Sequence, residues 1–205
     1  MNERKIKVWD VGVRVFHWSL VVFFTIAWFT GDESEDLHSI AGYVVLALLV
    51  FRIIWGFIGP QYARFSNFIY PPGIIIRYLK SLSSGYPEHY YGHNPAGGAM
   101  VFLLLINLSI VCWTGLEAWG AEGHGPLAQI NQMKLIGDAI ASADTNKTEE
   151  ENEEEEFWEE WHEISTNSML FLIFLHIAGV YVSSKLHREN LIRAMITGYK
   201  EKFNE

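Results

Sequence analysis

The sequence predicts an all-α membrane protein, a single domain over residues 1–205 in which four helices form a transmembrane bundle. Half of the residues are hydrophobic and 15% are aromatic, which is high for a soluble protein of 205 residues. The apolar residues also run in blocks that can cross about 30 Å of hydrocarbon, which takes roughly 20 residues. The predicted spans cover residues 12–30, 38–59, 97–119 and 163–184.

The first span follows a basic stretch, as the apolar part of a signal peptide does, but it ends in Trp28-Phe29-Thr30-Gly31-Asp32 and not in a small-residue cleavage site. We therefore expect a helix that stays in the protein. Cys112 is the only cysteine, which excludes an intrachain disulfide, and the sequence has no C-x-x-C-H motif for covalent attachment of heme. Any heme would be held by ligation alone.

The net charge of −9 is distributed unevenly along the chain. Basic residues flank the N-terminus, the 60–96 segment and the C-terminal tail, whereas residues 32–36 and 117–163 are acidic. Because cytoplasmic loops carry the excess of Lys and Arg, we expect both termini in the cytoplasm and the acidic loops outside. Four spans satisfy the even number that this topology requires.

The connections between the spans differ in length and character. Only about seven polar residues join the first two spans, which makes these spans antiparallel neighbours. Residues 61–96 are too polar to span, but residues 73–82 could form a short interfacial helix on the cytoplasmic surface. The outer loop ends in a glutamate-rich run at 149–160, whose like charges favour a solvated, partly disordered tether; a docking surface for a basic partner is a compatible interpretation.

Four of the eight histidines lie in or at the ends of the predicted spans, namely His17, His38, His162 and His176. An ionisable side chain at membrane depth is costly, so its presence indicates a functional role. Fourteen residues separate His162 from His176. At about 100° per residue this spacing places both rings on one side of the helix, roughly 21 Å apart along its axis. The depths pair His38 with His162 near the outside and His17 with His176 near the inside.

Two imidazoles on different helices at one depth are what bis-histidine ligation of a heme requires in a helix bundle. A lone membrane histidine is more often a hydrogen-bonded packing residue, but four at matched depths favour ligation. Zinc or copper is an alternative, although a structural zinc site usually has four ligands and each level here offers two. Two stacked hemes would form an electron path across the bilayer.

Small and basic residues near these pairs fit the same interpretation. Gly42 and Gly179 lie close in sequence to His38 and His176, and each could leave room for a macrocycle or serve close helix packing. Arg52 should share the face of His38 at the depth of the inner pair, where it could meet heme propionates or extend to the headgroups. The remaining histidines are predicted to be surface or loop residues: His89, His93, His124 and His187.

Several strings of residues carry a family resemblance. They are Val8-Trp-Asp-x-x-x-Arg14-x-x-His17-Trp18, His38-x-x-x-Gly42, Phe51-Arg52-x-x-Trp55-Gly56-x-x-Gly59, Ala63-Arg64-Phe65 and Gly92-His93-Asn94-Pro95-Ala96-Gly97. As a set they resemble bacterial cytochrome b561 proteins and the b-type cytochrome subunit of nickel–iron hydrogenases. The resemblance implies two noncovalent b hemes, quinone exchange within the membrane and a redox partner outside, with the ligands carried over to His17, His38, His162 and His176. The long glutamate-rich loop departs from the family pattern.

Six-coordinate iron has no open position for oxygen or substrate, so we expect electron transfer between the quinone pool and a periplasmic partner. That partner could be a soluble cytochrome c, a dehydrogenase or a hydrogenase. Candidates for a polar quinone pocket at the cytoplasmic side are Arg14, Trp18, Arg52 and Arg64. The alternatives are a superoxide:quinone oxidoreductase, which an acidic outer surface disfavours, and a histidine-based metal-binding or transport protein. The expected location is the bacterial inner membrane, and no nucleic acid is expected as a partner.

Overall fold

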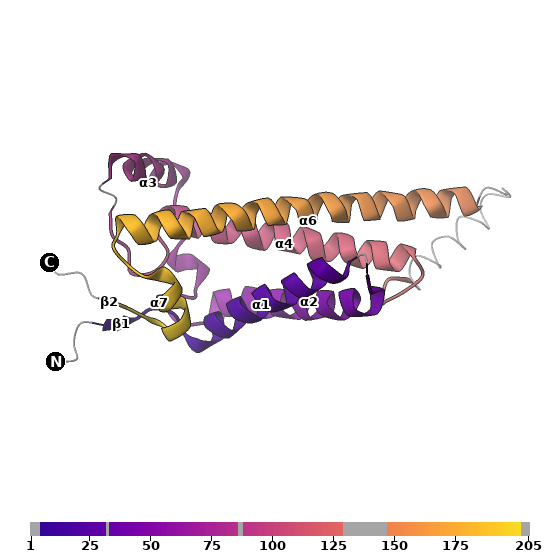
Figure 1. Cartoon of the computed structure of the whole chain (residues 1–205), viewed down its shortest axis with the longest axis horizontal. Helices are drawn as coiled ribbons and strands as arrows, with labels where there is room; N and C mark the ends of the chain where they lie inside the picture. Colours follow the sequence, from indigo (N-terminus) through magenta and orange to yellow (C-terminus); the bar gives the residue numbers. More distant parts are fainter. Residues whose placement is uncertain (1–4, 32, 86–87, 129–146, 202–205) are drawn as a thin grey trace. The chain divides into compact units, whose positions relative to one another are not determined.

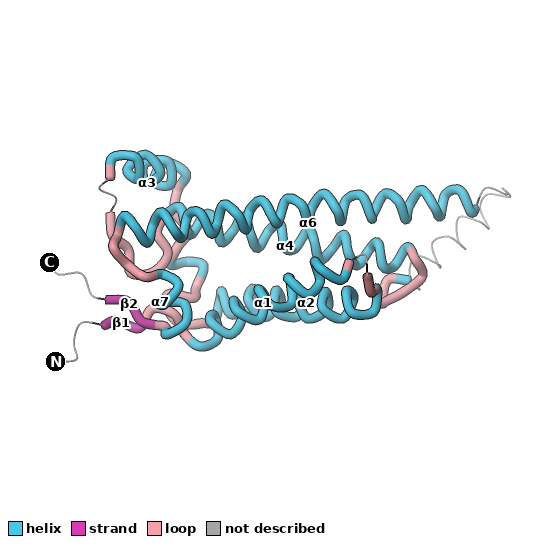
Figure 2. The backbone as a smooth tube through the Cα atoms, viewed as in Figure 1, coloured by secondary structure: helices cyan, strands magenta, loops and turns pink. Residues whose placement is uncertain are grey.

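The computed structural model describes residues 5–31, 33–85, 88–128 and 147–201, most of them helical (Figure 1, Figure 2). The chain divides into two compact units, Met1–Leu105 with Leu172–Glu205 and Ile106–Phe171, and each is described by itself. Within the described residues, four helices are long and apolar enough to cross a membrane. They are Val11–Thr30, Glu35–Ile58, Pro95–Ala121 and Glu153–Leu186. Each of the four predicted spans coincides with one of these helices, and the fourth helix begins before the predicted span.

The first two spans are α1 (Val11–Thr30) and α2 (Glu35–Ile58), which lie side by side in the first unit (Figure 1). Asp10 caps α1, because its carboxylate accepts a hydrogen bond of 3.2 Å from the backbone N–H of Val13. The same oxygen accepts from Trp55 Nε1 of α2 at 3.0 Å. Two of the strings that carry the resemblance therefore meet at one carboxylate, which ties the start of α1 to the end of α2.

The other two spans are α4 (Pro95–Ala121) and α6 (Lys147–Leu186). The side chain of Asn94 accepts a hydrogen bond of 2.7 Å from the backbone N–H of Gly97, and Pro95 occupies the first helical position, where proline is favoured.

Helix α6 has 40 residues and begins before the glutamate run, so the prediction of a partly disordered tether is wrong for that run. Glutamate is a strong helix former, and negative charge is favourable near a helix N-terminus. These two effects outweigh the repulsion on which the prediction relied. The preceding part of the predicted outer loop, residues 129–146, lies outside the described residues.

The connection at residues 61–96 contains a 3₁₀ turn, η1 (Phe65–Asn67), and the helix α3 (Pro72–Ser84), which covers the stretch 73–82 predicted to be interfacial. A left-handed Gly85, with φ of 78°, ends α3, a conformation that favours glycine. Tyr78 is buried, whereas Ile76 and Leu79 are exposed. The predicted helix is therefore present and carries exposed apolar side chains, while its position on a membrane surface stays a prediction.

The two ends of the chain pair as short antiparallel strands, β1 (Lys5–Lys7) and β2 (Tyr199–Glu201), with Ile6 opposite Lys200. The short helix α7 (Leu191–Thr197) precedes β2, and the Gly198 carbonyl between them accepts from the N–H groups of Val8 and Trp9. The sequence did not predict this sheet. The pairing of a strand before the first span with a strand after the fourth fits an even number of spans. That both ends lie in the cytoplasm stays a prediction.

Candidate cofactor site

His17 of α1 and His176 of α6 face each other within the first unit. Their ring centroids lie 6.5 Å apart, with the ring planes tilted by 52°. A metal–imidazole bond of about 2.0 Å and roughly 1.2 Å from nitrogen to ring centre, counted on both sides, give about 6.4 Å for two imidazoles on one metal. The observed distance of 6.5 Å between the two ring centroids matches this value. The Nδ1 atom of His17 is also buried and has no hydrogen-bond partner within the described residues, which indicates a missing group.

His38 and His162 belong to different units, so their pairing stays a prediction, but each ring is oriented within its own unit. His38 Nδ1 lies 2.9 Å from the carbonyl oxygen of Ala27. His162 Nδ1 lies 3.1 Å from the carbonyl oxygen of Val111 and 3.1 Å from Oγ1 of Thr114. A neutral ring that donates from Nδ1 carries its lone pair on Nε2, which is the tautomer of a metal ligand.

The surroundings of His162 contain residues that the sequence analysis did not identify. Oγ1 of Thr114 and Oγ of Ser165 are 3.3 Å apart, and both residues are buried. A Cβ atom added to Gly115 would lie 2.8 Å from Cε1 of His162, so only glycine admits the ring in its present position. The sequence signal that could have revealed this support is the small, partly polar Thr114-Gly115 pair within an apolar span.

Gly42 and Gly179 lie beside open space. A Cβ added at either position would meet nothing within 4 Å among the described residues. Gly56, in contrast, is closely packed, because a Cβ there would lie 2.1 Å from the Phe65 ring. The open space argues against close helix packing at these two glycines, and the place of a macrocycle beside them stays a prediction.

Arg52 is 3% exposed although it carries a full positive charge. Its Cζ lies 4.7 Å from the centroid of the Phe65 ring, and its Nη1 has no hydrogen-bond partner in the part of the chain that the structure describes. Among the described residues it forms no ion pair. A side chain that reached the headgroups would be exposed, so the burial argues against that interpretation. A buried charge without a counterion is costly, which points to an anion that binds here.

The structure brings together two of the four residues predicted for a quinone pocket. Arg14 and Trp18 line a groove of about 300 Å³ whose other walls are Val11, Val15, Ser19 and Ile196. Nη2 of Arg14 donates to the carbonyl oxygen of Ile196, and the Trp18 ring lies edge-on to His17 at 5.1 Å. Arg52 and Arg64 do not line this groove, and Arg64 is exposed at the start of η1.

Of the histidines predicted to be surface or loop residues, His93 differs most from the prediction. It lies in a loop, but its ring packs against Phe68 at 4.3 Å and Trp9 at 4.7 Å between centroids, and its Nδ1 is buried. His89 and His124 are exposed, and half-buried His187 lies in the turn after α6, as expected.

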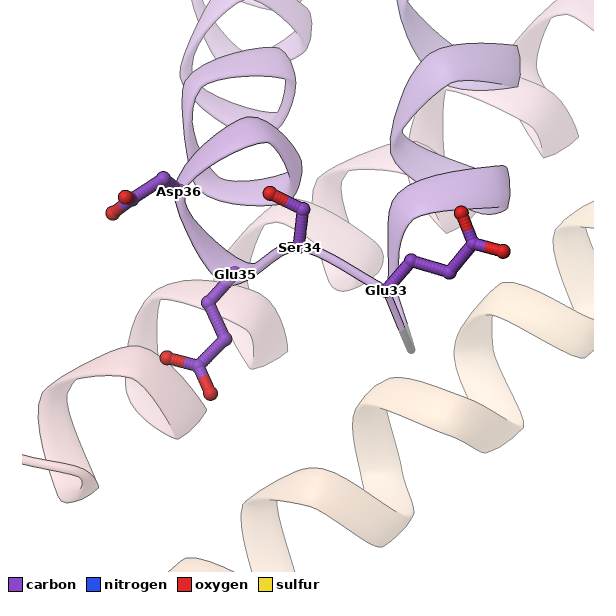
Figure 3. A pocket seen from close by; sticks show the side chains of 5 residues that line it. Glu33, Ser34, Glu35 and Asp36 are labelled. Atoms are coloured by element: carbon purple, nitrogen blue, oxygen red, sulfur yellow. The ribbon is translucent and has the colours of Figure 1, made fainter.

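A second cavity, of about 360 Å³, lies in the connection between α1 and α2 (Figure 3). Glu33, Ser34, Glu35 and Asp36 line it together with Gly31. The three carboxylates point in different directions (Figure 3), so they offer no converging set of ligands.

Four membrane-crossing helices that carry facing imidazoles are typical of membrane b-type cytochromes. The sequence profile of the prokaryotic cytochrome b561 family matches residues 8–198, and the chain belongs to that family. Curated relatives are probable Ni/Fe-hydrogenase B-type cytochrome subunits. That of Bradyrhizobium diazoefficiens is 23% identical over 95% of this chain and 85% of its own length. That of Azotobacter chroococcum is 24% identical over 97% and 90%, and that of Rhodobacter capsulatus 23% over 97% and 82%.

No solved structure matches the chain significantly. The family match confirms the resemblance found in the sequence, and it makes the chain a multi-pass membrane protein that transfers electrons through heme b.

Proposed function

We propose that the chain is a diheme cytochrome that carries electrons between the quinone pool and a periplasmic redox partner across the bacterial inner membrane. His17 and His176 hold the inner heme, and His38 and His162 hold the outer one. The facing of His17 and His176 at 6.5 Å is the observation that carries this proposal. Each heme, when bound, supplies a one-electron carrier.

The chain's own contribution is to hold its imidazoles as neutral ligands in fixed orientations. The Nδ1 atoms of His38 and His162 donate to backbone carbonyls of membrane spans, and such helical backbone is rigid. A hydrogen bond of this kind raises the basicity of the ligand and is worth about 10- to 100-fold in metal affinity. Two protein ligands also leave no open position on the iron, which suits electron transfer and excludes direct bond chemistry there.

The groove beside Arg14 and Trp18 is the proposed quinone site. Its volume of about 300 Å³ is at the lower limit for small-molecule sites, which are mostly apolar with a few polar groups. Val11, Val15 and Ile196 supply the apolar walls, and the guanidinium of Arg14 supplies a polar donor. Because Trp18 also packs edge-on to His17, the groove lies next to the inner pair of histidines.

The proposed partner is a periplasmic redox protein with a basic surface, either a hydrogenase-type subunit or a soluble cytochrome c. The printed names of the relatives, which are subunits of Ni/Fe-hydrogenases, favour the first. The start of α6 favours a partner with a basic docking face, because its own surface is acidic. Exposed glutamates there include Glu153, Glu154, Glu159 and Glu160.

Heme stoichiometry tests the proposal. Pyridine hemochrome analysis of the purified protein should give two b hemes for each chain. A redox titration of the heme that remains should show that His17→Ala and His176→Ala each remove the same heme and that His38→Ala removes the other. His124→Ala is the matched control, because this exposed histidine should leave both hemes in place. A native protein with one heme, or variants of His17 and His38 that lose the same heme, would contradict the assignment.

A further inference from the structure

Four buried nitrogen atoms of the first unit lack partners among the described residues, and two of them lie near the same aromatic rings. These two are Nη1 of Arg52 and Nδ1 of His93. Buried polar groups in folded proteins are nearly always hydrogen-bonded, so each of these atoms requires a group that is not a described residue. Arg52 comes from α2 and His93 from the loop before α4, and one ligand could serve both if they lie close together.

A chain of aromatic rings connects the two residues. Arg52 Cζ lies 4.7 Å from the Phe65 ring centroid, Phe65 lies 5.9 Å from Phe68, and Phe68 lies 4.3 Å from His93. Trp9 packs edge-on to the His93 ring at 4.7 Å. Burial and, next in size, the charge of Arg52 lower the pKa of His93 to about 3, which places the guanidinium within electrostatic range of the ring. The Arg52 guanidinium and the His93 ring therefore border one buried region around Phe65 and Phe68, the Arg52–His93 pocket.

The charge of Arg52 favours an anion as the group that would satisfy both nitrogen atoms. Arg52 is positively charged, and the nearby Lys200 has its own counterion, Glu189, at 3.0 Å. Asp10, the carboxylate that stabilises the charge of Arg52 from a distance, already accepts hydrogen bonds from Val13 and Trp55. His93 stays neutral at physiological pH, so it can donate from Nδ1 without bringing a second charge into the pocket.

The depth of the pocket indicates which anion binds there. Arg52 lies six residues before the end of α2, and His17 lies six residues after the start of α1. At 1.5 Å per residue, both lie about 9 Å inside their helices, and the two helices are antiparallel neighbours. His176 also lies within electrostatic range of His93. The pocket is thus level with the pair that the proposed function assigns to the inner heme, and heme b carries two propionate carboxylates.

We propose that Arg52 and His93 together bind one propionate of the inner heme, Arg52 donating from Nη1 and His93 from Nδ1. This inference rests on the proposed function, because it takes the inner heme to lie between His17 and His176. Both residues act on the iron through the carboxylate and are therefore positioning residues. Donors that neutralise a carboxylate near the iron favour the reduced state, so their removal lowers the midpoint potential of that heme.

An optical redox titration of the purified holoprotein tests the inference. His93→Phe keeps an aromatic ring packed against Trp9 and Phe68 and removes the donor. Arg52→Gln removes the charge. Each should lower the midpoint potential of the same heme, the one that His17→Ala removes, and leave the other heme unchanged. His93→Gln retains a donor and should stay nearer to the native potential. His124→Phe makes the same change at an exposed histidine outside the pocket, so it should leave both potentials unchanged.

Redox-induced infrared difference spectra identify the anion. With heme labelled with ¹³C at the propionate carboxyls, the carboxylate band that changes in His93→Phe should shift with the label. A carboxylate band that does not shift with the label would overturn the inference. A His93→Phe protein with native midpoint potentials would do the same. If His93→Phe does not assemble, Arg52→Gln serves in the same infrared measurement. Fewer than two hemes in the native protein would refute the proposed function itself, so the two failures are distinguishable.

Discussion

Gly115 of α4 lies directly against the ring of His162, so Gly115→Ala should weaken the outer site. The added Cβ would stand 2.8 Å from Cε1 and 3.1 Å from Nδ1 of the ring. Comfortable carbon–carbon contact begins near about 3.5 Å, so the ring has to retreat by roughly 0.7 Å. Nδ1 is now 3.1 Å from both the Val111 carbonyl and Oγ1 of Thr114, and a retreat of that size takes it beyond hydrogen-bonding distance.

The expected magnitude follows from the cost of overpacking, about 1–3 kcal/mol. If that cost falls on the ligand, the affinity for the outer heme drops roughly 5- to 160-fold. The loss of the hydrogen bond to a ligating histidine alone has a similar size, about 10- to 100-fold. Both estimates predict a protein that keeps its inner heme and is purified with a depleted outer heme.

The measurement is hemochrome stoichiometry combined with a redox titration of each heme. Gly73→Ala in α3 is the matched control, because the same substitution there meets nothing within 4 Å. It should leave both hemes in place. A Gly115→Ala protein with two hemes at native potentials would show that the ring of His162 does not need its present position.

Trp55→Phe removes the 3.0 Å hydrogen bond to the Asp10 carboxylate, so it should lower the thermal midpoint in detergent, by the equivalent of about 1.5–3 kcal/mol; an unchanged midpoint would contradict this. Gly179→Leu places a side chain in the open space beside the glycine and should expel the inner heme, whereas full occupancy would mean that the macrocycle lies elsewhere. Replacing the glutamates of 153–160 by glutamine should remove the salt dependence of electron transfer to a basic cytochrome c, because screening acts on opposite-charge steering; identical salt profiles would leave the run without a docking role. Burial lowers the pKa of His187 below 6.5, so the unfolded chain takes up this proton first and stability should decline below that pH. The decline should be smaller in His187→Gln, and matching pH profiles would refute the linkage.

The spans and the inner histidine pair could be predicted because local patterns encode them. An apolar run long enough to cross the bilayer is visible without any knowledge of packing. The depth of His17 and His176 follows from counting residues along helices of fixed rise. The burial of Arg52 could also be anticipated, because its spacing from His38 places it on the ligand face.

The residues that support the ligands could not be found in this way, because they act through contacts between distant parts of the chain. Nothing in the string around His93 marks a ring that packs against Trp9 and Phe68. Gly115 is one glycine among 17 until the ring of His162 is seen against it.

The glutamate run shows a different kind of error. The repulsion of like charges does oppose a helix there. The helix propensity of glutamate and the favourable field at a helix N-terminus act in the other direction, and the prediction left them out. The terminal strands were missed for a simpler reason. Lys5–Lys7 and Tyr199–Glu201 have three residues each, too few for an alternating pattern to be recognised.

The pairing of β1 with β2 constrains the order of biogenesis. β1 leaves the ribosome well before β2, which follows the fourth span and α7 along the chain, so the strand pair cannot form until both of these have been made. Until then the backbone of Lys5–Lys7 has no partner, and Trp9 lacks Ala194, its neighbour in the small core next to the strands. A chain truncated before Tyr199 would therefore display an open strand edge, which is a template for pairing with another chain.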